Sequence, residues 1–594
     1  MLPPDRIFVL GEALVPPPDY RADAVIALTY SLDLPMALAL PLAMLREGEL
    51  AGETFESVPR IEVFEALRRL VPCYRVFCDA GGMYPPPRRR LRILPLLDSV
   101  IVPVSIPALP SGRRPAFHPK LILLRFVRDG EPTRMRLICM SRNLTSDTSL
   151  DISVRLEGEE TGGATDAGCE RLAAALRQLL HWVVRTPDAA RSQALIESLA
   201  ASVRRSRWQP PDEFESCSFW PLGFDRSTRG DPTLLQDGEE RMLVISPFLS
   251  AGRLHGLTAT GANHVLVSRE AELQQVGTRA LAGFSALHRL APRVGGAELH
   301  AKLYLAEMPR RTRWLVGSAN ATEAAVAGNA EFLVELNGSK RSLRISSLLD
   351  PTDGIGGLLS AYEIAPDDPV EPQADPRSDA EDEMRQLAAL GFRGTVHVQL
   401  DGRYTLEVSV DAVSGRAPRG RVEAHLAGNS ATTTLDFASD PVGVLTGLEL
   451  ADLSPFLVLR LELAGVPMER TVMLILDGVD CARLGEQALR DAVRDPLAYL
   501  TYLVTGSDGG TELALTFEED EPLDAAAAAA EGTAQLPYRP HPALLEKLLQ
   551  MLHGDQPGGT GRFEEIGHLI DGFADQLPPQ LAQLWTTLDR GRRT

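Results

Sequence analysis

The first 350 residues alternate short, continuous apolar runs with longer segments whose apolar residues recur at helical spacing. Residues 24–30 (AVIALTY) form such a run, which is typical of a strand buried on both faces, and the spacing over residues 34–45 predicts a helix after it. Two further runs, 74–78 (YRVFC) and 100–106 (VIVPVSI), predict more strands. Strands that alternate with helices predict an α/β fold, in which helices cover both faces of a mostly parallel or mixed sheet.

The same local order occurs twice along the chain. In the first copy, residues 120–126 (KLILLRF) and 136–140 (RLICM) predict a β-hairpin around the turn at Asp129-Gly130. The pattern restarts with predicted strands at 242–248 and 264–268, a helix from Glu270, and a second hairpin-like pair at 302–308 and 313–317. We interpret this internal repeat as two related α/β halves.

Beyond the repeat, the hydrophobic pattern changes twice. Residues 365–383 are rich in Pro, Asp and Glu and predict an exposed linker. Apolar and polar residues then alternate with a period of two, which predicts a small antiparallel β-domain, with a sandwich favoured, whose strands are 394–400, 404–410, 421–427, 432–437, 456–463 and 471–476. From about Arg483 the pattern predicts helices, interrupted by an acidic, alanine-rich tract at 518–532 that we expect to be disordered.

The expected organisation is therefore two halves followed by three smaller parts. They are a first half (1–205), a second half (206–350), an acidic proline-rich linker (351–385), a β-rich domain (386–480) and a mostly helical C-terminal region (481–594). The length of 594 residues fits a chain of several domains.

Composition narrows the class of protein. The chain is 44% hydrophobic and 24% charged, no apolar run is long enough for a membrane span, and the N-terminus lacks the pattern of a signal peptide, so we expect a cytoplasmic protein that does not bind membranes. The six cysteines show no metal-binding spacing, and we expect free thiols, no metal site and no cofactor.

The net charge of −20 argues against general attraction to nucleic acid or to anionic lipid, but it allows a local basic groove. Arginine clusters occur in the half of the chain that carries the repeat. Arg88, Arg89 and Arg90 follow three prolines and are the cluster that we expect to reach a polyanion.

Each copy of the repeat contains the same series of polar residues. The first series is His118, Lys120, Ser141, Asn143 and Asp151; the second is His300, Lys302, Ser318, Asn320 and Glu331. In each, the histidine and the lysine are two residues apart at the start of a strand, so their side chains point to one face. The chain contains only four lysines, and two of them occupy these positions. An ammonium group can approach one phosphate oxygen more compactly than a guanidinium can, which gives a reason for this choice.

Such a set can transfer a phosphodiester without a metal. One histidine attacks phosphorus and forms a phosphohistidine, and the other protonates the leaving oxygen and then activates water. The lysines and asparagines stabilise charge on the phosphate oxygens, and Asp151 and Glu331 are candidates to orient the imidazoles. Ser141 and Ser318 are candidate substrate-binding residues or loop-orienting residues.

The duplicated His-x-Lys motif with a downstream Asn resembles the phospholipase D superfamily over about residues 20 to 345. The family pattern adds an acidic residue five positions after each lysine. Glu307 nearly matches it, whereas Arg125 departs from it, and in this the chain looks closer to the tyrosyl-DNA phosphodiesterase branch. The first copy also reads Ser-Arg-Asn where Gly-Ser-x-Asn is usual.

The resemblance implies two pseudo-repeated α-β-α halves that share one active site. It also implies that His118 is the nucleophile, oriented by Glu331, and that His300 is the general acid, oriented by Asp151, although the reverse assignment stays open. The family acts on phospholipids, nucleic acids and protein–DNA adducts. We expect a nuclease or DNA-end-processing phosphodiesterase with DNA favoured over RNA, and by analogy a role in bacterial phage defence or restriction.

Two alternatives remain open at this stage. One is a phospholipid-cleaving enzyme of the phospholipase D type; the other is a non-catalytic assembly module with this fold. In either case the β-rich or helical C-terminal parts can contact a protein partner, and the oligomeric state is not predicted.

Overall fold

The computed structural model describes residues 10–45, 70–86, 94–110, 112–146, 149–162, 166–186, 188–225, 240–291, 298–363, 376–411 and 418–479, with Leu484 and residues 585–586. These residues form a mixed α/β architecture with five sheets. The α-helices among them are α1 (Leu10–Leu14), α2 (Leu34–Leu45), α4 (Ala167–Leu179), α5 (Ala189–Arg205), α6 (Ala251–Leu257), α7 (Glu270–Leu281), α8 (Glu323–Ala327), α9 (Ile345–Leu348) and α10 (Pro376–Ala388).

The first sheet has seven strands, and its centre is the buried run expected at residues 24–30. In spatial order they are β3 (Ile101–Val104), β2 (Tyr74–Asp79), β1 (Arg21–Thr29), β4 (Leu121–Val127), β5 (Arg134–Met140), β7 (Ser153–Glu160) and β8 (Ser206–Gln209). Strands β1, β2 and β3 run parallel, and β4, β5, β7 and β8 add to them through antiparallel pairs. The predicted hairpin is confirmed as β4 and β5, with Gly130 at a positive φ of 77° in the connecting turn.

The second sheet has eight strands: β17 (Leu359–Ala361), β12 (Phe284–Leu290), β11 (His264–Val267), β10 (Arg241–Ile245), β14 (Leu303–Glu307), β15 (Arg311–Gly317), β16 (Glu331–Ser339) and β9 (Phe214–Leu222). Strands β10 to β12 run parallel, and β14 to β16 continue antiparallel. Six neighbouring strands of each sheet thus have the same chain order and the same pairing directions. The predicted second hairpin is confirmed as β14 and β15.

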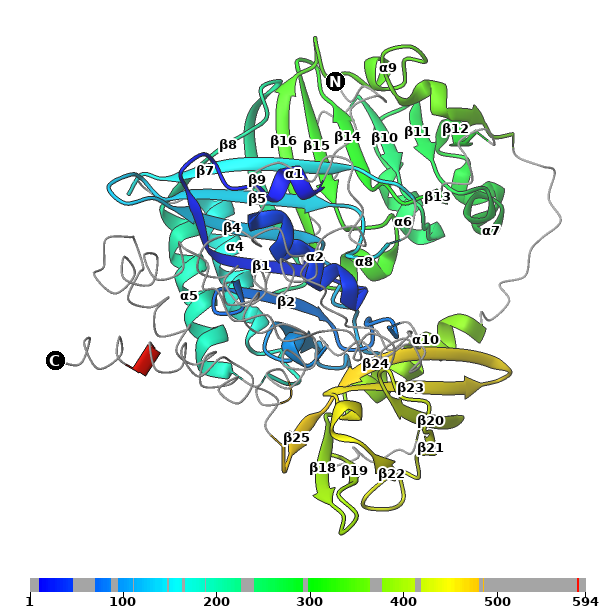
Figure 1. Cartoon of the computed structure of the whole chain (residues 1–594). Helices are drawn as coiled ribbons and strands as arrows, with labels where there is room; N and C mark the ends of the chain where they lie inside the picture. The colour runs from blue at the N-terminus through cyan, green and yellow to red at the C-terminus, as the bar shows by residue number, and fades with distance from the viewer. Residues whose placement is uncertain are drawn as a thin grey trace, which may run out of the picture.

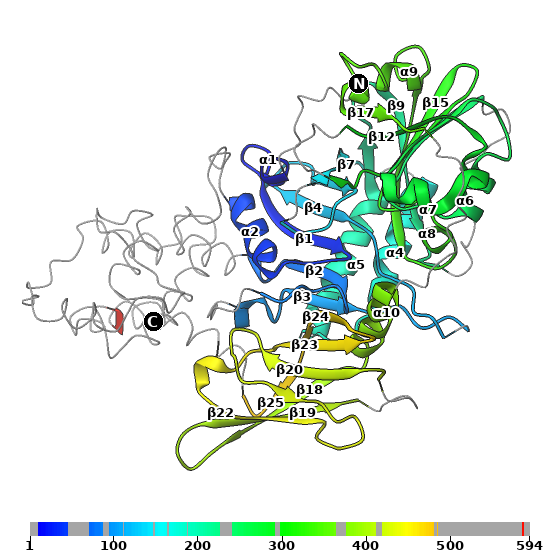
Figure 2. The same cartoon turned by 90° about the vertical axis from the view of Figure 1, so that its right-hand side faces the viewer.

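The two large sheets lie side by side, and their facing surfaces share one hydrophobic core (Figures 1 and 2). This core includes Leu123 and Leu137 of the first sheet, Leu305 and Val316 of the second, and residues of α4 and α5. Helices α1 and α2 cover the other face of the first sheet, and α6 and α7 cover the other face of the second. Burial of both faces explains why the central strands are continuously apolar.

A second line of contact joins the halves through backbone pairing. The short strands β6 (Ser149–Leu150) and β13 (Glu298–Leu299) pair in parallel, one from each half. Phe117 and Ala330 form an isolated parallel bridge in the same manner. These two pairings come directly before the candidate site residues and fix their positions across the junction.

The third domain contains two four-stranded sheets. One is β22 (Gly443–Leu448), β19 (Tyr404–Val410), β18 (Phe392–Val398) and β25 (Ile475–Asp477); the other is β21 (Thr433–Thr434), β20 (Arg421–Leu426), β23 (Phe456–Leu463) and β24 (Val466–Met473). The pairs are antiparallel except β18 with β25, which run parallel, so the expectation of a purely antiparallel domain is wrong at this pair. The domain packs on the first half, where Phe456, Val458 and Met473 join the core beneath α1 and α2 (Figure 1).

Three expected boundaries differ from the structure. Strand β8 pairs with β7, so residues 206–209 belong to the first sheet and the boundary after residue 205 falls too early. Strand β17 pairs with β12, so residues 359–361 belong to the second sheet and not to the linker expected at 351–385. Residues 376–388, placed largely in an exposed linker, form helix α10, because Ala380, Met384 and Leu387 give this acidic segment a buried apolar stripe. Except for Leu484 and residues 585–586, the region expected to be helical at 481–594 lies outside the described residues.

The loop after β2 approaches β1 so closely that Gly82 has no space for a side chain. A Cβ at this position would lie 1.9 Å from the carbonyl oxygen of Tyr30. We expect Gly82→Ala to destabilise the protein by about 2 kcal/mol or more, measured as a lower Tm. The control is Gly11→Ala in α1, where a Cβ meets nothing within 4 Å; it should leave Tm unchanged or slightly higher. Equal Tm values for the two variants would contradict the conclusion that Gly82 has no space for a side chain.

Candidate active site

Each His-x-Lys segment enters a hairpin strand at the junction of the two halves. His118 and Lys120 precede β4, and His300 and Lys302 precede β14. The backbone N–H of His118 donates to the carbonyl of Ala330 at 2.9 Å, and that of His300 donates to the carbonyl of Leu150 at 3.0 Å. Each histidine is therefore held by the opposite half, at the residue before that half's candidate carboxylate.

The side chains repeat this exchange. His118 Nδ1 lies 2.8 Å from Glu331 Oε2, and His300 Nδ1 lies 3.0 Å from Asp151 Oδ1. The two histidine side chains are 14% and 16% exposed, whereas Glu331 is fully buried. With Nδ1 engaged by a carboxylate, the Nε2 atom of each ring is left for a ligand. The structure thus brings together the two pairs that the sequence predicted.

The two serines contact the carboxylates. Ser141 Oγ donates to Asp151 Oδ1 at 2.9 Å, and Ser318 Oγ donates to Glu331 Oε2 at 2.5 Å. Each hydroxyl also accepts the backbone N–H of the residue after that carboxylate, Ile152 or Phe332, at 2.9 Å. Both serines are completely buried, so of the two roles that the sequence left open these contacts favour the loop-orienting one.

The first copy lacks the glycine that usually precedes the serine, but its serine makes the same hydrogen bonds as the serine of the second copy. Met140 and Gly317 precede the serines at the ends of β5 and β15, and the serine hydrogen bonds are the same in both copies. Glycine is required only at 317, where a Cβ would lie 2.1 Å from the carbonyl oxygen of Phe332.

Both lysines are buried beside the histidines. Lys120 Nζ donates to the carbonyl of His118 at 2.9 Å, and Lys302 Nζ donates to the carbonyls of His300 at 2.7 Å and Ser141 at 3.2 Å. Burial lowers the pKa of Lys120 to about 7 and lowers that of Lys302 well below its usual value. An anion that binds here would stabilise the charged form of both ammonium groups.

Asn143 and Asn320 complete the repeated set. The side-chain oxygen Oδ1 of each is buried and has no hydrogen-bond partner among the described residues. A buried polar atom without a partner is costly, and such atoms are found at sites that bind ligands. The same defect at the equivalent position of both copies indicates that these amides are arranged for a ligand.

The two carboxylates differ in their electrostatic environment. Burial raises the pKa of Glu331 to about 8, although the nearby lysines and Ser318 oppose this shift. Burial also raises the pKa of Asp151, but hydrogen bonds from His300, Ser149 and Ser141 outweigh it and lower the pKa to about 2. At neutral pH, Asp151 is therefore ionised, whereas burial disfavours the ionised form of Glu331.

The histidines differ accordingly. Burial, then the charges of Lys120, Lys302 and His300, lower the pKa of His118 well below its usual value. Burial also lowers the pKa of His300, but the hydrogen bond and the charge of Asp151 partly restore it. Of the two histidines, His300 is therefore the one that more readily holds a second proton.

Sequence reasoning missed two residues at the His118 side of the site. The ring of Tyr30, directly after β1, lies 5.2 Å from the imidazole of His118 at an interplanar angle of 53°. Asp79, the last residue of β2, is buried and accepts the backbone N–H of Phe117 at 2.9 Å. Both lie at the carboxyl ends of parallel strands, where ligand sites of α/β sheets gather, and this rule was the signal that could have found them.

The positions five residues after the lysines have structural roles. Arg125 forms two hydrogen bonds with the Asp23 carboxylate, at 2.9 and 3.0 Å. The carboxylate of Glu307 accepts the backbone N–H of Ile345 at the start of α9, at 2.7 Å. Arg125, which replaces the acidic residue of the family pattern, therefore contacts Asp23 within the first half. The pairing of each histidine with a carboxylate is the same in both copies.

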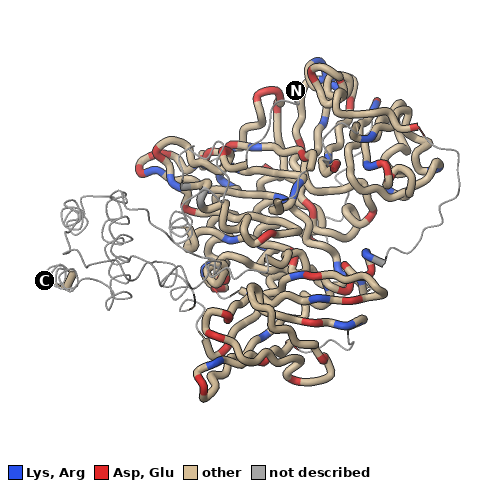
Figure 3. The backbone as a smooth tube through the Cα atoms, turned by 45° about the vertical axis from the view of Figure 1, so that its right-hand side comes forward, with Lys and Arg blue, Asp and Glu red and all other residues tan. Residues whose placement is uncertain are grey.

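The arginine clusters do not form a described basic surface at the site. Arg88, Arg89 and Arg90 lie outside the described residues. Arg204 and Arg205 form ion pairs with Glu170 and Glu160 at 2.8 and 3.0 Å. Figure 3 shows positive and negative residues interspersed along the described chain. Trp208 is buried against Phe219, as expected of a core residue.

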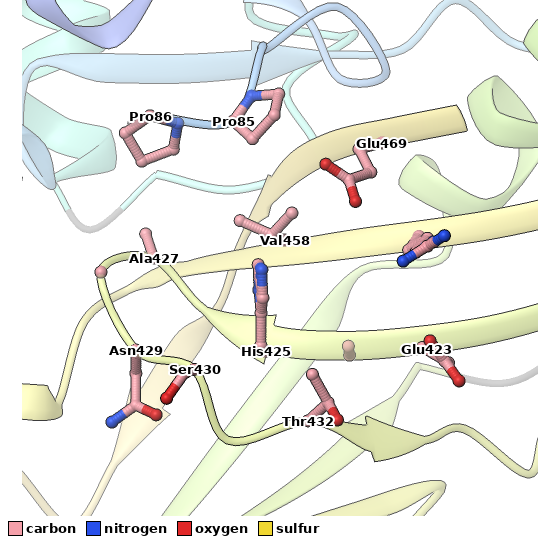
Figure 4. Close-up of a pocket in the computed structure, with 13 residues that line it drawn as sticks. Pro85, Pro86, Glu423, His425, Ala427, Asn429, Ser430, Thr432, Val458 and Glu469 are labelled. Atoms are coloured by element: carbon pink, nitrogen blue, oxygen red, sulfur yellow. The ribbon is translucent and has the colours of Figure 1, made fainter. Parts of the chain in front are cut away.

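The hollows among the described residues include a large one and a smaller one. A cavity of about 780 Å³ borders Asn143 and Asp151 and extends between the sheets along mostly aliphatic side chains, such as Leu303 and Val316. A smaller one, about 350 Å³, lies between Pro85-Pro86 and the surface of β20 and β23, and Figure 4 shows His425 and Glu469 at its wall. Only the larger one contacts candidate site residues, so it is the hollow that can admit part of a substrate.

The described ranges contain neither a group of metal-binding side chains nor a membrane-spanning helix. Within them, no three His, Cys, Asp or Glu side chains gather in a way that could hold a metal ion. No helix in the same ranges is long and apolar enough to cross a membrane. The described cysteines, Cys73, Cys78, Cys139, Cys169 and Cys217, are free thiols.

Comparison with known proteins gives limited guidance. No protein-family profile and no curated protein matches the chain. Solved structures similar to it include a mutant of yeast tyrosyl-DNA phosphodiesterase, with 12% identity, a TM-score of 0.34, and coverage of 55% of this chain and 84% of that one. Another is the polyphosphate kinase of Porphyromonas gingivalis, with 11% identity, a TM-score of 0.31, and coverage of 64% and 50%. Scores this low do not identify the activity of the chain.

The raised pKa of Glu331 makes stability depend on pH. Between pH 4.5 and about 8 the native state holds a proton at Glu331 that the unfolded chain has lost, so the contribution of this carboxyl to stability falls as pH rises through this window. The lowered pKa values of His118 and Lys120 act in the opposite direction, so each variant is compared with the wild type. We expect the change in Tm from pH 5 to pH 8 to be more positive in Glu331→Gln than in the wild type. The control is Asp151→Asn: the lowered pKa of Asp151 contributes stability that is lost only as pH falls toward about 2. Its change in Tm from pH 5 to pH 8 should match the wild type; the same shift in both variants would contradict the assignment.

Proposed function

We propose that this chain is a metal-independent phosphodiesterase of the phospholipase D type that acts on nucleic acid through a phosphohistidine. The observation that supports it best is the exchanged pairing, in which each imidazole Nδ1 contacts a carboxylate of the opposite half. This geometry leaves two Nε2 atoms and two buried ammonium groups in one cluster. A phosphate between them is offered a nucleophile, a proton donor and two countercharges.

The reaction follows in two balanced steps. Nε2 of His118 attacks phosphorus and forms a P–N bond while the bond to the leaving oxygen breaks, and His300 Nε2 gives that oxygen its proton. Water then attacks phosphorus, gives a proton to His300, and the P–N bond breaks to regenerate His118. Lys120, Lys302, Asn143 and Asn320 stabilise the charge on the remaining phosphate oxygens.

Electrostatics favours this assignment of the histidines over its reverse. A nucleophile must have a free electron pair on Nε2, and a general acid must carry a proton there. His118 is the ring whose pKa is lowered further, so it holds a second proton less readily than His300 does. His300 faces the ionised Asp151, which stabilises an imidazolium. Environments that separate two similar groups in this way indicate acid and base roles.

The substrate class is less directly supported by the site. We favour DNA because the site offers several cations to phosphate, and because the sequence shows no amphipathic, aromatic-rich helix for docking at a lipid surface. A phospholipid is the second candidate, favoured by the largely aliphatic cavity of about 780 Å³ beside Asp151. DNA and phospholipid vesicles should therefore be tested in parallel.

The first test uses labelled single- and double-stranded DNA in EDTA. We expect cleavage that survives the chelator and falls at least roughly 1,000-fold in His118→Ala and in His300→Ala, because each removes a reacting group. The control is His255→Ala, which changes an exposed histidine of α6 that bonds only to its own helix; it should retain activity. Strict Mg²⁺ dependence would contradict the proposal, and turnover of vesicles alone would select the phospholipid.

The roles of the two histidines can be separated with the leaving group. The nitrophenolate of a nucleotide 4-nitrophenyl ester leaves without protonation, so we expect His300→Ala to release it in a first-turnover burst at much of the wild-type rate, whereas His118→Ala should show no burst. Later turnovers of His300→Ala should stay slow, because His300 activates the water of the second step. Mass spectrometry of quenched His300→Ala should show a phosphoryl adduct on the His118 peptide. An adduct on His300 in the His118→Ala protein would reverse the assignment.

A further inference from the structure

Helix α10 belongs to the third domain but lies against the first half, beside the candidate site. Its buried face, which includes Met384 and Leu387, joins the core of the third domain. On the other side, a Cβ on Gly81, in the loop after β2, would lie 3.0 Å from Cγ and 3.1 Å from Cα of Arg385. The absence of a side chain at Gly81 therefore allows Arg385 to enter the space at the carboxyl ends of β1 and β2.

The loop itself is tied to the third domain. The backbone N–H of Thr471 in β24 donates to the carbonyl of Met83 at 2.9 Å, and Thr471 Oγ1 donates to the carbonyl of Tyr84 at 3.2 Å. The guanidinium of Arg470 lies 4.6 Å from the ring centroid of Tyr84. These contacts fix the position of α10 relative to His118, so Arg385 is held in place by both domains.

The guanidinium of Arg385 is only partly engaged. One terminal nitrogen donates to Asp382 on the same helix, and the buried Nε has no hydrogen-bond partner among the described residues. The side chain is 18% exposed, so it is mostly desolvated but still reachable. A guanidinium has five N–H donors, and buried ones are costly unless they are paired.

A purely structural ion pair does not account for this residue. Asp79 is the nearby carboxylate on the first half, but its two oxygens accept the backbone N–H groups of Gly81 and Phe117, at 3.0 and 2.9 Å. Among the described residues, no ion pair joins Arg385 to Asp79. The buried Nε–H of Arg385 is therefore left for a group that the described residues do not supply.

The position of this cation relative to the histidine cluster indicates which phosphate it can reach. Arg385 packs against Gly81, whose backbone N–H donates to Asp79 at 3.0 Å. Asp79 also accepts the backbone N–H of Phe117, the residue before His118, at 2.9 Å. Arg385 therefore lies on the Asp79 side of His118. A phosphate held by the lysines leaves Arg385 free for a neighbouring one.

We propose that Arg385 binds a second phosphate of the substrate, next to the one that is cleaved, so that the third domain completes the binding site. The planar fork of a guanidinium matches two phosphate oxygens. The inference rests on the proposed phosphodiesterase function and narrows its substrate to a chain with at least two phosphates, as in an oligonucleotide.

The experiment compares a long and a short substrate. We expect Arg385→Ala and Arg385→Gln to lower kcat/KM for an oligonucleotide roughly 10- to 100-fold, mainly through KM, and Arg385→Lys to restore part of it. With a 4-nitrophenyl ester that carries a single phosphate, kcat/KM should change less than about twofold. Arg377→Ala, at an exposed position of the same helix, should behave as wild type on both substrates.

Binding is measured separately from cleavage. In a His118→Ala background, Arg385→Ala should weaken binding of a fluorescent oligonucleotide and reduce the slope of log Kd against log salt by about 0.7. Equal loss on both substrates with a lower Tm would show that Arg385 only anchors α10. Unchanged oligonucleotide binding would also overturn the inference. If the wild type binds the oligonucleotide through Arg385 but cleaves nothing, the proposed function fails and this inference stands.

Discussion

The exchange of partners between histidines and carboxylates is the constraint on which the site depends. His118 needs Glu331, and His300 needs Asp151, so neither half contains a complete imidazole–carboxylate pair of its own. The backbone hydrogen bonds from His118 to Ala330 and from His300 to Leu150 also hold the main chain of each histidine against the opposite half. Breaking a buried pair leaves an uncompensated polar group, which typically costs several kcal/mol. Docking of the halves and assembly of the site are therefore one event.

Within this symmetric frame, a small chemical difference separates the two sides. Asp151 collects hydrogen bonds from two serines and His300 and stays ionised, whereas Glu331 is sealed in the core and its pKa rises. The geometry of the two pairs is similar, so the difference comes from solvation and from the number of donors. A duplicated fold thus provides two positions with the same shape but different proton affinity, which is what sequential acid and base steps require.

The sequence predicted the hairpins and the buried central strands, and it singled out the ten polar residues of the two series, because strand periodicity and short motifs are local signals. It left the role of Ser141 and Ser318 open, since nothing in a motif shows that a hydroxyl will bond to a carboxylate ten or thirteen residues later. It missed Tyr30 and Asp79 because they come from the ends of other strands and depend on topology. It also placed Arg385 at a linker edge, because a Pro- and Asp-rich helix start hides a sparse apolar stripe.

The position of α10 changes what the third domain is for. If that domain only stabilised the first half, apolar contacts such as those of Phe456 and Met473 would suffice, and a desolvated guanidinium against Gly81 would be an unnecessary cost. The loop from Asp79 to Tyr84 contains a glycine where Arg385 enters and backbone bonds where β24 docks. Arg385 is fixed by both domains, so a phosphate bound to it would be held at a defined distance from the one at His118. A rigid third domain can in this way set which bond along a polyphosphate chain reaches the nucleophile.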